Sequence, residues 1–254
     1  MERQLQGHYL PGIISVSGLA TVATCYALSV YGGHIELYST TDITGTGKHS
    51  PSKYIFRTMM MSLSIIMIWA WYLCFCWIKF EIKRQEKQRE RKFILHPIMM
   101  LVCGIIGSIG LLLTSMCITD VNFPLEFHLA TAMIFFSCTV SAQIVCTRIL
   151  YDLKMGGEGY QVVHWLSMRV KYATHAVSAF VLLCLIVFLL FSLPLWCYHV
   201  CEWTLLIALL CYNMTWCHDW KDKITTAVHV SNPMSVYEKY SLPTVMPDEH
   251  MEDI

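Results

Sequence analysis

Long hydrophobic runs alternate with short polar segments along most of the chain. Six runs stand out, each about 21 to 25 residues long, and they cover residues 11–32, 54–78, 97–118, 127–147, 172–193 and 199–220. A helix needs about 20 apolar residues to cross the hydrocarbon core of a bilayer. Lipid offers the backbone no hydrogen-bond partners, so each run must be helical. The pattern predicts an all-α membrane protein, a bundle of six transmembrane helices that occupies residues 1–220.

Composition agrees with this prediction. Of the 254 residues, 56% are hydrophobic and only 14% are charged, whereas charged residues usually make up about 25% of a soluble protein. The formal net charge is zero, so no basic field favours nucleic acid. We therefore expect the lipid bilayer, and no nucleic acid, as a partner.

The first run could also be read as a cleaved signal peptide. The segment before it, MERQLQGHYL, carries one arginine and one glutamate, and so it lacks the positive region of such a peptide. We expect a retained helix.

Lysine and arginine are distributed unequally between the two sides of the predicted bundle. Seven of the eighteen lie in the segment 79–92. Eight more fall on the same side: Arg3, Arg148, Lys154, Arg169, Lys171, Lys221, Lys223 and Lys239. Only Lys48, Lys53 and Arg57 remain for the other side. Because basic residues stay in the cytosol, both termini are predicted to be cytosolic, with a disordered polar tail over 221–254.

The stretch GTGKHSP, residues 45–51, resembles part of a phosphate-binding loop. A P-loop needs a glycine five residues before its second glycine and a hydroxyl after the lysine, but Asp42 and His49 occupy these positions. The stretch is also predicted to face the lumen, away from cytosolic nucleotide. We interpret it as a turn before the second helix, with Ser50 as N-cap and Pro51 as the first helical residue.

A few ionisable residues lie about one turn inside the lumenal ends of the predicted helices. Arg57, His128 and Glu202 share this depth in the second, fourth and sixth helices. Such residues normally face the bundle interior and find partners there. We expect a lumen-facing polar pocket in which Arg57 and Glu202 form an ion pair beside His128, with Asp42, Asp120 and His199 at its mouth.

Two interpretations of this pocket remain open. It could be a structural clasp that holds three helices together, or a site for a lipid head group or metal ion with His128 and His199 as ligands. A metal site would need three ligands at a fixed spacing, so the sequence assigns no metal, no cofactor and no catalytic residue.

Three short passages resemble one family of membrane proteins. They are ITGTGKHSPSKYIF at 43–56, HLATAMIFF at 128–136 and CEW at 201–203. In this order and placement they resemble the DNA-damage-regulated autophagy modulator (DRAM) family, part of a wider six-span superfamily that includes GPI-anchor lipid remodelling factors. The chain departs from the family pattern where Ile43 separates Asp42 from Thr44, and where Ser52 replaces an acidic residue after the proline.

The resemblance implies a multi-pass protein of lysosomal or other endomembranes that promotes autophagy. It supplies no chemical activity, so we expect no enzyme. The alternatives are an enzyme or lipid-handling factor of the GPI-anchor-remodelling or intramembrane hydrolase type, and a channel or transporter subunit. The Golgi and the plasma membrane are the alternative locations. The segment 79–92 could attract anionic lipid head groups, and protein partners are not specified.

Overall fold

The described part of the protein, in this computed structural model, comprises residues 7–36, 41–85, 90–117, 125–154, 162–191 and 194–221. All regular structure within these ranges is helical, and six helices are long and apolar enough to span a membrane, which confirms the predicted fold class. They are α1 (Leu10–Tyr31), α2 (Ser52–Arg84), α3 (Arg91–Met116), α4 (Leu125–Lys154), α5 (Trp165–Phe191) and α6 (Leu195–Asp219). Two short 3-10 helices, η1 (Gly7–Tyr9) and η2 (Gly45–Gly47), accompany them. Asp120 and most of the predicted tail lie outside the described residues.

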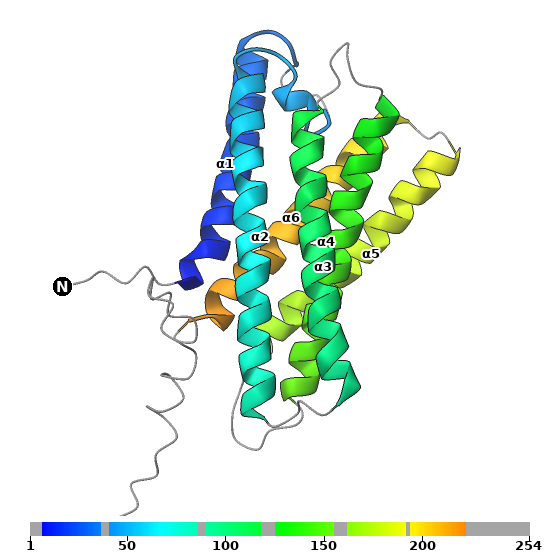
Figure 1. Cartoon of the computed structure of the whole chain (residues 1–254). Helices are drawn as coiled ribbons and strands as arrows, with labels where there is room; N and C mark the ends of the chain where they lie inside the picture. The colour runs from blue at the N-terminus through cyan, green and yellow to red at the C-terminus, as the bar shows by residue number, and fades with distance from the viewer. Residues whose placement is uncertain are drawn as a thin grey trace, which may run out of the picture.

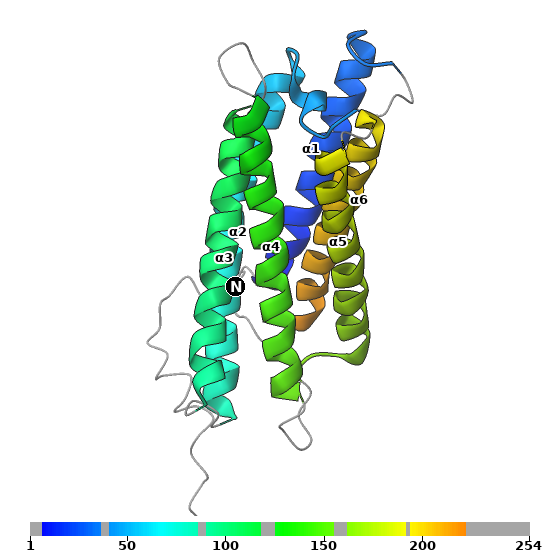
Figure 2. The same ribbon diagram turned by 90° about the vertical axis from the view of Figure 1, so that its right-hand side faces the viewer.

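The six helices form one closed ring. Each helix packs against the next along the chain, and α6 packs against α1 to complete the circle (Figures 1 and 2). The end of the bundle that carries residues 41–53 is called the loop end below. The opposite end, where α1 begins and α6 finishes, is called the tail end. The two ends of the described chain thus lie at the same end of the bundle.

Several helices extend beyond the hydrophobic runs that predicted them. The second run was placed at 54–78, yet α2 continues to Arg84. The helix α3 begins at Arg91, so Pro97, at which the third hydrophobic run starts, lies inside the helix. Hydropathy detects only the part of a helix that crosses the hydrocarbon core, whereas long basic side chains let a helix continue into the head-group region.

The start of α2 differs from the predicted cap. The helix begins at Ser52 with Pro51 at the N-cap position and no side-chain cap, so the assignment of Ser50 as N-cap is wrong. The Ser50–Pro51 peptide bond is cis. The first N–H groups of the helix instead find backbone acceptors: Lys53 N donates to His49 O at 2.8 Å and Tyr54 N donates to Pro51 O at 3.2 Å. The turn before the helix therefore satisfies donors that a side-chain cap would otherwise satisfy.

Aromatic side chains fill the interior of the bundle. The rings of Trp71 and Trp216 meet edge-on with centroids 4.8 Å apart, and Trp216 also stacks on Trp220. The helices α3 and α4 approach closely because α3 carries glycines at the contact. A Cβ on Gly110 would lie 2.8 Å from the backbone nitrogen of Phe135. Small residues of this kind allow membrane helices to pack backbone against backbone.

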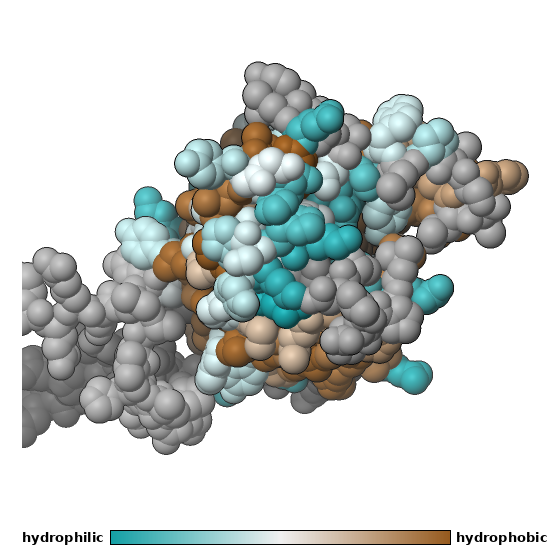
Figure 3. All heavy atoms as spheres, turned by 90° about the horizontal axis from the view of Figure 1, so that it is seen from above, coloured by the Kyte–Doolittle hydropathy of each residue, from teal (hydrophilic) through white to brown (hydrophobic). Residues whose placement is uncertain are grey.

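The outer surface divides into a polar end and apolar sides. Seen from the loop end, hydrophilic residues gather over the centre and hydrophobic residues appear around the flanks (Figure 3). Large apolar side chains on the flanks, such as Trp69 and Phe180, are exposed. This is the surface expected of a bundle whose sides are surrounded by lipid.

Candidate functional site

Residues 41–53, called the clasp loop here, fold back over the loop end of the bundle. The carboxylate of Asp42 organises the first part of the loop. Its Oδ2 accepts hydrogen bonds from the Thr44 hydroxyl at 2.7 Å and from Gly45 N at 3.0 Å. A Cβ on Gly45 would overlap the Asp42 carboxylate, so this turn requires glycine. The Asp42 carboxylate thus accepts the N–H of Gly45, the first residue of the short helix η2.

Apolar and hydroxyl side chains anchor the clasp loop to α1 and α2. The side chain of Ile43 is buried in a cluster with residues such as Val22 and Phe56. Ser29 of α1 donates to Thr46 O at 2.7 Å, and its oxygen lies 3.3 Å from the Ser52 hydroxyl. Ser52, at the position where the family pattern has an acid, is therefore part of this anchor.

The helix α6 holds the backbone of the same loop from the other side. The carboxylate Oε2 of Glu202 accepts a hydrogen bond from Ile43 N at 3.1 Å. The next residue, Trp203, donates from Nε1 to Thr41 O at 2.9 Å. Glu202 is 5% exposed, and a buried backbone N–H without an acceptor is costly. Glu202 therefore stabilises the folded position of the loop.

His128 joins the clasp loop to the ends of α3 and α4. Its Nδ1 donates to Cys117 O at 3.0 Å, since a carbonyl oxygen can only accept, and its Nε2 lies 3.1 Å from the Thr44 hydroxyl. The ring is 6% exposed. A single side chain near the start of α4 thus fixes both the loop and the last turn of α3.

The predicted polar pocket is therefore assembled in part. Asp42, His128 and Glu202 all contact the clasp loop. Within the described residues Glu202 forms no ion pair with Arg57, which lies half-buried near the start of α2. We expected the Glu202 carboxylate to pair with the guanidinium of Arg57. It accepts the backbone N–H of Ile43 instead, because the clasp loop packs directly against Glu202. His199 faces a hollow between α1 and α6.

A small cavity lies beneath the clasp loop. It has a volume of about 70 Å³, and Ile43, Thr44 and Glu202 form part of its lining. Most of the lining is apolar, and Thr139 of α4 and Asn213 of α6 are polar side chains that line it farther from the loop. A cavity of this size can hold a few water molecules but no lipid. No group of three His, Cys, Asp or Glu residues within the described ranges could hold a metal ion.

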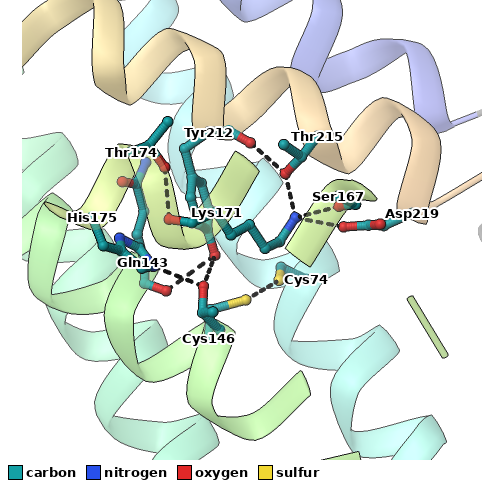
Figure 4. A network of polar contacts seen from close by, with 11 residues as sticks. Cys74, Gln143, Cys146, Ser167, Lys171, Thr174, His175, Tyr212, Thr215 and Asp219 are labelled. Carbon is teal, nitrogen blue, oxygen red and sulfur yellow. Dashed lines mark hydrogen bonds and ion pairs between the residues drawn. The ribbon is translucent and has the colours of Figure 1, made fainter. Parts of the chain in front are cut away.

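A second buried cluster, which the sequence did not reveal, lies in the tail half of the bundle. Lys171 of α5 and Asp219 of α6 form an ion pair with 2.6 Å between Nζ and Oδ2, and neither side chain is exposed to solvent (Figure 4). The Lys171 ammonium also donates to the hydroxyls of Ser167, at 3.0 Å, and Thr215. We call these four residues the lysine cluster.

Further hydrogen bonds connect the lysine cluster region to α4. The Tyr212 hydroxyl donates to Gln143 O at 3.0 Å and lies 3.1 Å from the Thr147 hydroxyl. Thr147 in turn lies 2.8 Å from His175 Nε2. These contacts join α4, α5 and α6, and Figure 4 also draws the contact of Cys146 with Cys74 of α2, whose sulfur atoms are 3.8 Å apart. Polar residues at 212, 215 and 219 recur at the spacing of one helix face, and this was the signal available in the sequence.

Comparison with known families gives one match. The model of the Frag1/DRAM/Sfk1/Cwh43P N-terminal domain matches residues 6–223. The chain belongs to this family. It is an integral, multi-pass membrane protein, as its six spans also indicate. No curated protein sequence and no solved structure matches it.

The three passages that resemble the DRAM family lie together in the structure. The passage 43–56 forms most of the clasp loop and the start of α2, 128–136 opens with His128, and 201–203 contains Glu202 and Trp203. These segments are far apart in the sequence, yet they meet through the hydrogen bonds of the clasp loop. The residues that carry the resemblance therefore build one structural unit.

Proposed function

We propose that this member of the family is an endomembrane protein, resident in lysosomes, that modulates autophagy without catalysing a reaction. The observation that supports this most directly is that the polar residues at the loop end form hydrogen bonds that hold the clasp loop. Thr44 lies against His128 as a nucleophile lies against its base, but its single hydroxyl proton is directed to Asp42 at 2.7 Å. The polar groups hold the loop in place, which fits an interaction protein better than a hydrolase.

The orientation of the protein is part of the same proposal. The excess of lysine and arginine that the sequence puts on one side supports a cytosolic location for both termini and a lumenal location for the clasp loop. In intact cells, a reporter cysteine at Lys48 is expected to be shielded from reagents confined to the cytosol, whereas one at Gln85 is expected to react. The reverse labelling pattern would contradict the orientation.

The basic segment 79–92 is proposed to lie against anionic lipid head groups of the cytosolic leaflet. Acidic neighbours neutralise part of its charge: Arg84 pairs with Glu81 at 2.9 Å and Lys92 pairs with Glu90 at 3.2 Å. Binding through this segment should therefore be weak and salt-sensitive.

One experiment tests the location and the role together. The tagged protein would be imaged against lysosome, Golgi and plasma-membrane markers while autophagic flux is measured after its removal and after re-expression. Lysosomal residence with reduced flux on removal supports the proposal. Golgi residence with altered GPI-anchor lipids would overturn it in favour of the lipid-remodelling alternative.

A variant pair at Thr44 separates a structural role from catalysis. In a threonine-dependent hydrolase, Thr44→Ser would retain activity and Thr44→Val would abolish it even in fully folded protein. In the proposed protein, the flux supported by either variant should follow the amount of folded protein in the membrane. Loss of function in correctly folded, correctly located Thr44→Val would favour the enzyme.

A further inference from the structure

A hollow of about 560 Å³ opens on the outer side of the bundle between α1 and α6. It has the size typical of small-molecule sites, about 300 to 1,000 Å³. Apolar lining residues on both helices are about half exposed, with Leu19 at 50% and Ile207 at 52%. The hollow therefore faces outward, and among membrane spans the medium at that surface is lipid. We call it the α1–α6 groove.

The groove exists because α1 and α6 are close at the tail end and diverge towards the loop end (Figure 1). In the tail half, the Ser15 hydroxyl donates to Leu210 O at 3.2 Å, which brings side chain and backbone of the two helices into contact. A Cβ on Gly12 would lie 3.1 Å from Cys217 Sγ. In the loop half, the small side chain of Ala23 lines the groove, so the space between the diverging helices is not filled.

The polarity of the lining changes along the groove. Thr41 of the clasp loop, Tyr26 and His199 line the part nearest the loop end, while Leu19 and Ile207 line the part nearer the middle of the bundle. His199 and Ile207 are separated by eight positions of one helix, or about 12 Å at 1.5 Å per residue. A polar entrance followed by an apolar channel matches a molecule with a polar head and a hydrocarbon tail.

We propose that the α1–α6 groove binds one acyl chain of a glycerophospholipid from the leaflet at the loop end, with the glycerol ester region beside His199 and Thr41. The groove occupies only the loop half of the α1–α6 contact, whereas a second transmembrane helix would need a contact along the whole span. The clasp loop contributes Thr41 to the groove, and Trp203 of α6 holds that residue through its carbonyl at 2.9 Å. A bound lipid would thus contact the structural unit described above. This binding site goes beyond the proposed function and does not depend on it.

The test uses the full-length protein in phosphatidylcholine nanodiscs that contain some phosphatidylcholine with a diazirine in one acyl chain. After photolysis, mass spectrometry maps the labelled peptides. We expect labelling concentrated on the groove faces of α1 and α6. Ala23→Phe, which fills the groove, should lower this labelling by about tenfold, because several CH₂ contacts are lost. Thr204→Phe fills the groove from α6 and serves as the second variant, in case the first does not fold.

Ala20→Phe is the matched control, because Ala20 is an exposed alanine of the same helix outside the groove lining. It should leave the labelling of the groove unchanged. Equal labelling around the whole bundle, or equal labelling of the filled variants, would overturn the proposal, since it would show ordinary surrounding lipid. Crosslinks between two copies of the chain at the groove, or displacement of the label by cholesterol but not by unlabelled phosphatidylcholine, would overturn it in favour of a dimer or a sterol.

Discussion

At the loop end the carboxylate of Glu202 receives a backbone N–H, whereas in the tail half the carboxylate of Asp219 receives a lysine ammonium. Both carboxylates are almost fully buried. The partners of the loop-end residues are mostly backbone groups: Ile43 N, Gly45 N, Thr41 O and Cys117 O. The partners in the lysine cluster are side chains, Ser167 on the same helix α5 and Thr215 and Asp219 on the neighbouring helix α6.

This difference reflects what each region must stabilise. The clasp loop has little regular structure, so its backbone groups need side chains as partners when they are buried. The helices in the tail half satisfy their own backbone, so the lysine cluster can only fix how α5 and α6 lie against each other. Loss of one residue should therefore release a loop at one end and leave an uncompensated charge at the other.

The largest effect is expected from Lys171→Met. Removing one partner of a buried ion pair typically costs about 3–5 kcal/mol, because the remaining charge stays buried. Asp219 would be that charge. The double variant Lys171→Met with Asp219→Leu should recover most of the loss, since two apolar side chains can replace a buried pair. The measurement is the free energy of unfolding of purified protein in mixed micelles under SDS titration.

Arg169→Met provides the control on the same helix. Arg169 is exposed and lies over the Trp165 ring at 4.6 Å, so its loss should change the free energy of unfolding by about 0.5 kcal/mol or less. If Lys171→Met were equally mild, the lysine cluster would not be a buried ion pair in the membrane, and the contrast between the two ends would disappear.

Lys171 also shows where prediction from the sequence failed. The six spans followed from hydropathy, which averages over all faces of a helix. By mean hydropathy, Lys171 lies just before the run 172–193, so the sequence places it among the basic residues that flank the spans. In the structure α5 begins earlier, at Trp165, and Lys171 turns towards α6. Which face of a helix is buried depends on its neighbours, and a single sequence does not contain that information directly.

The next effect concerns Glu202. Glu202→Leu should lower the free energy of unfolding by about 1–3 kcal/mol, because the buried Ile43 N–H loses its acceptor. Glu202→Gln keeps an acceptor oxygen and should cost clearly less. The same SDS titration measures both variants, with exposed Glu126 at the start of α4 changed to leucine as the control.

A double-mutant cycle sharpens this result. Arg57→Gln and Glu202→Gln should be additive within about 0.5 kcal/mol, as expected for residues that share no direct interaction. A coupling energy larger than this would indicate that Arg57 and Glu202 form the ion pair predicted from the sequence. The depth of Glu202 in the membrane was visible in the sequence, but its partner was not, because a backbone amide leaves no residue-specific signal.

A smaller and more local effect is expected from His128→Leu. The variant loses the hydrogen bond to Cys117 O, worth about 1 kcal/mol, together with the contact between the ring and Thr44. Amide exchange of residues 41–48 should become roughly tenfold faster through local opening of the loop, as measured by hydrogen exchange and mass spectrometry. The peptides of α5 and α6 should exchange as before. Faster exchange across the whole bundle would show that His128 supports global stability, and that the clasp loop is not an independent unit.

The smallest effect is a dependence of the loop end on pH. The rings of His34 and His49, both exposed and outside the spans, stack with centroids 4.2 Å apart. Partial desolvation and the nearby charges of His34 and Lys48 lower the pKa of His49 below its ordinary value. The folded loop then binds fewer protons than the unfolded loop, so the stability contributed by neutral His49 is present above about pH 6.5 and is lost as the pH falls below it. Because His49 is exposed, the loss should be small.

The melting temperature of the purified protein should fall slightly more between pH 7.5 and 5.5 in the wild type than in His49→Gln. The control His96→Gln, a change near the start of α3, should behave like the wild type. A larger fall in His49→Gln, or a wild type that gains stability in acid, would contradict this sign. The proposed orientation places these two histidines in the lumen, so an acidic compartment would act on the clasp loop and leave the buried lysine cluster unchanged.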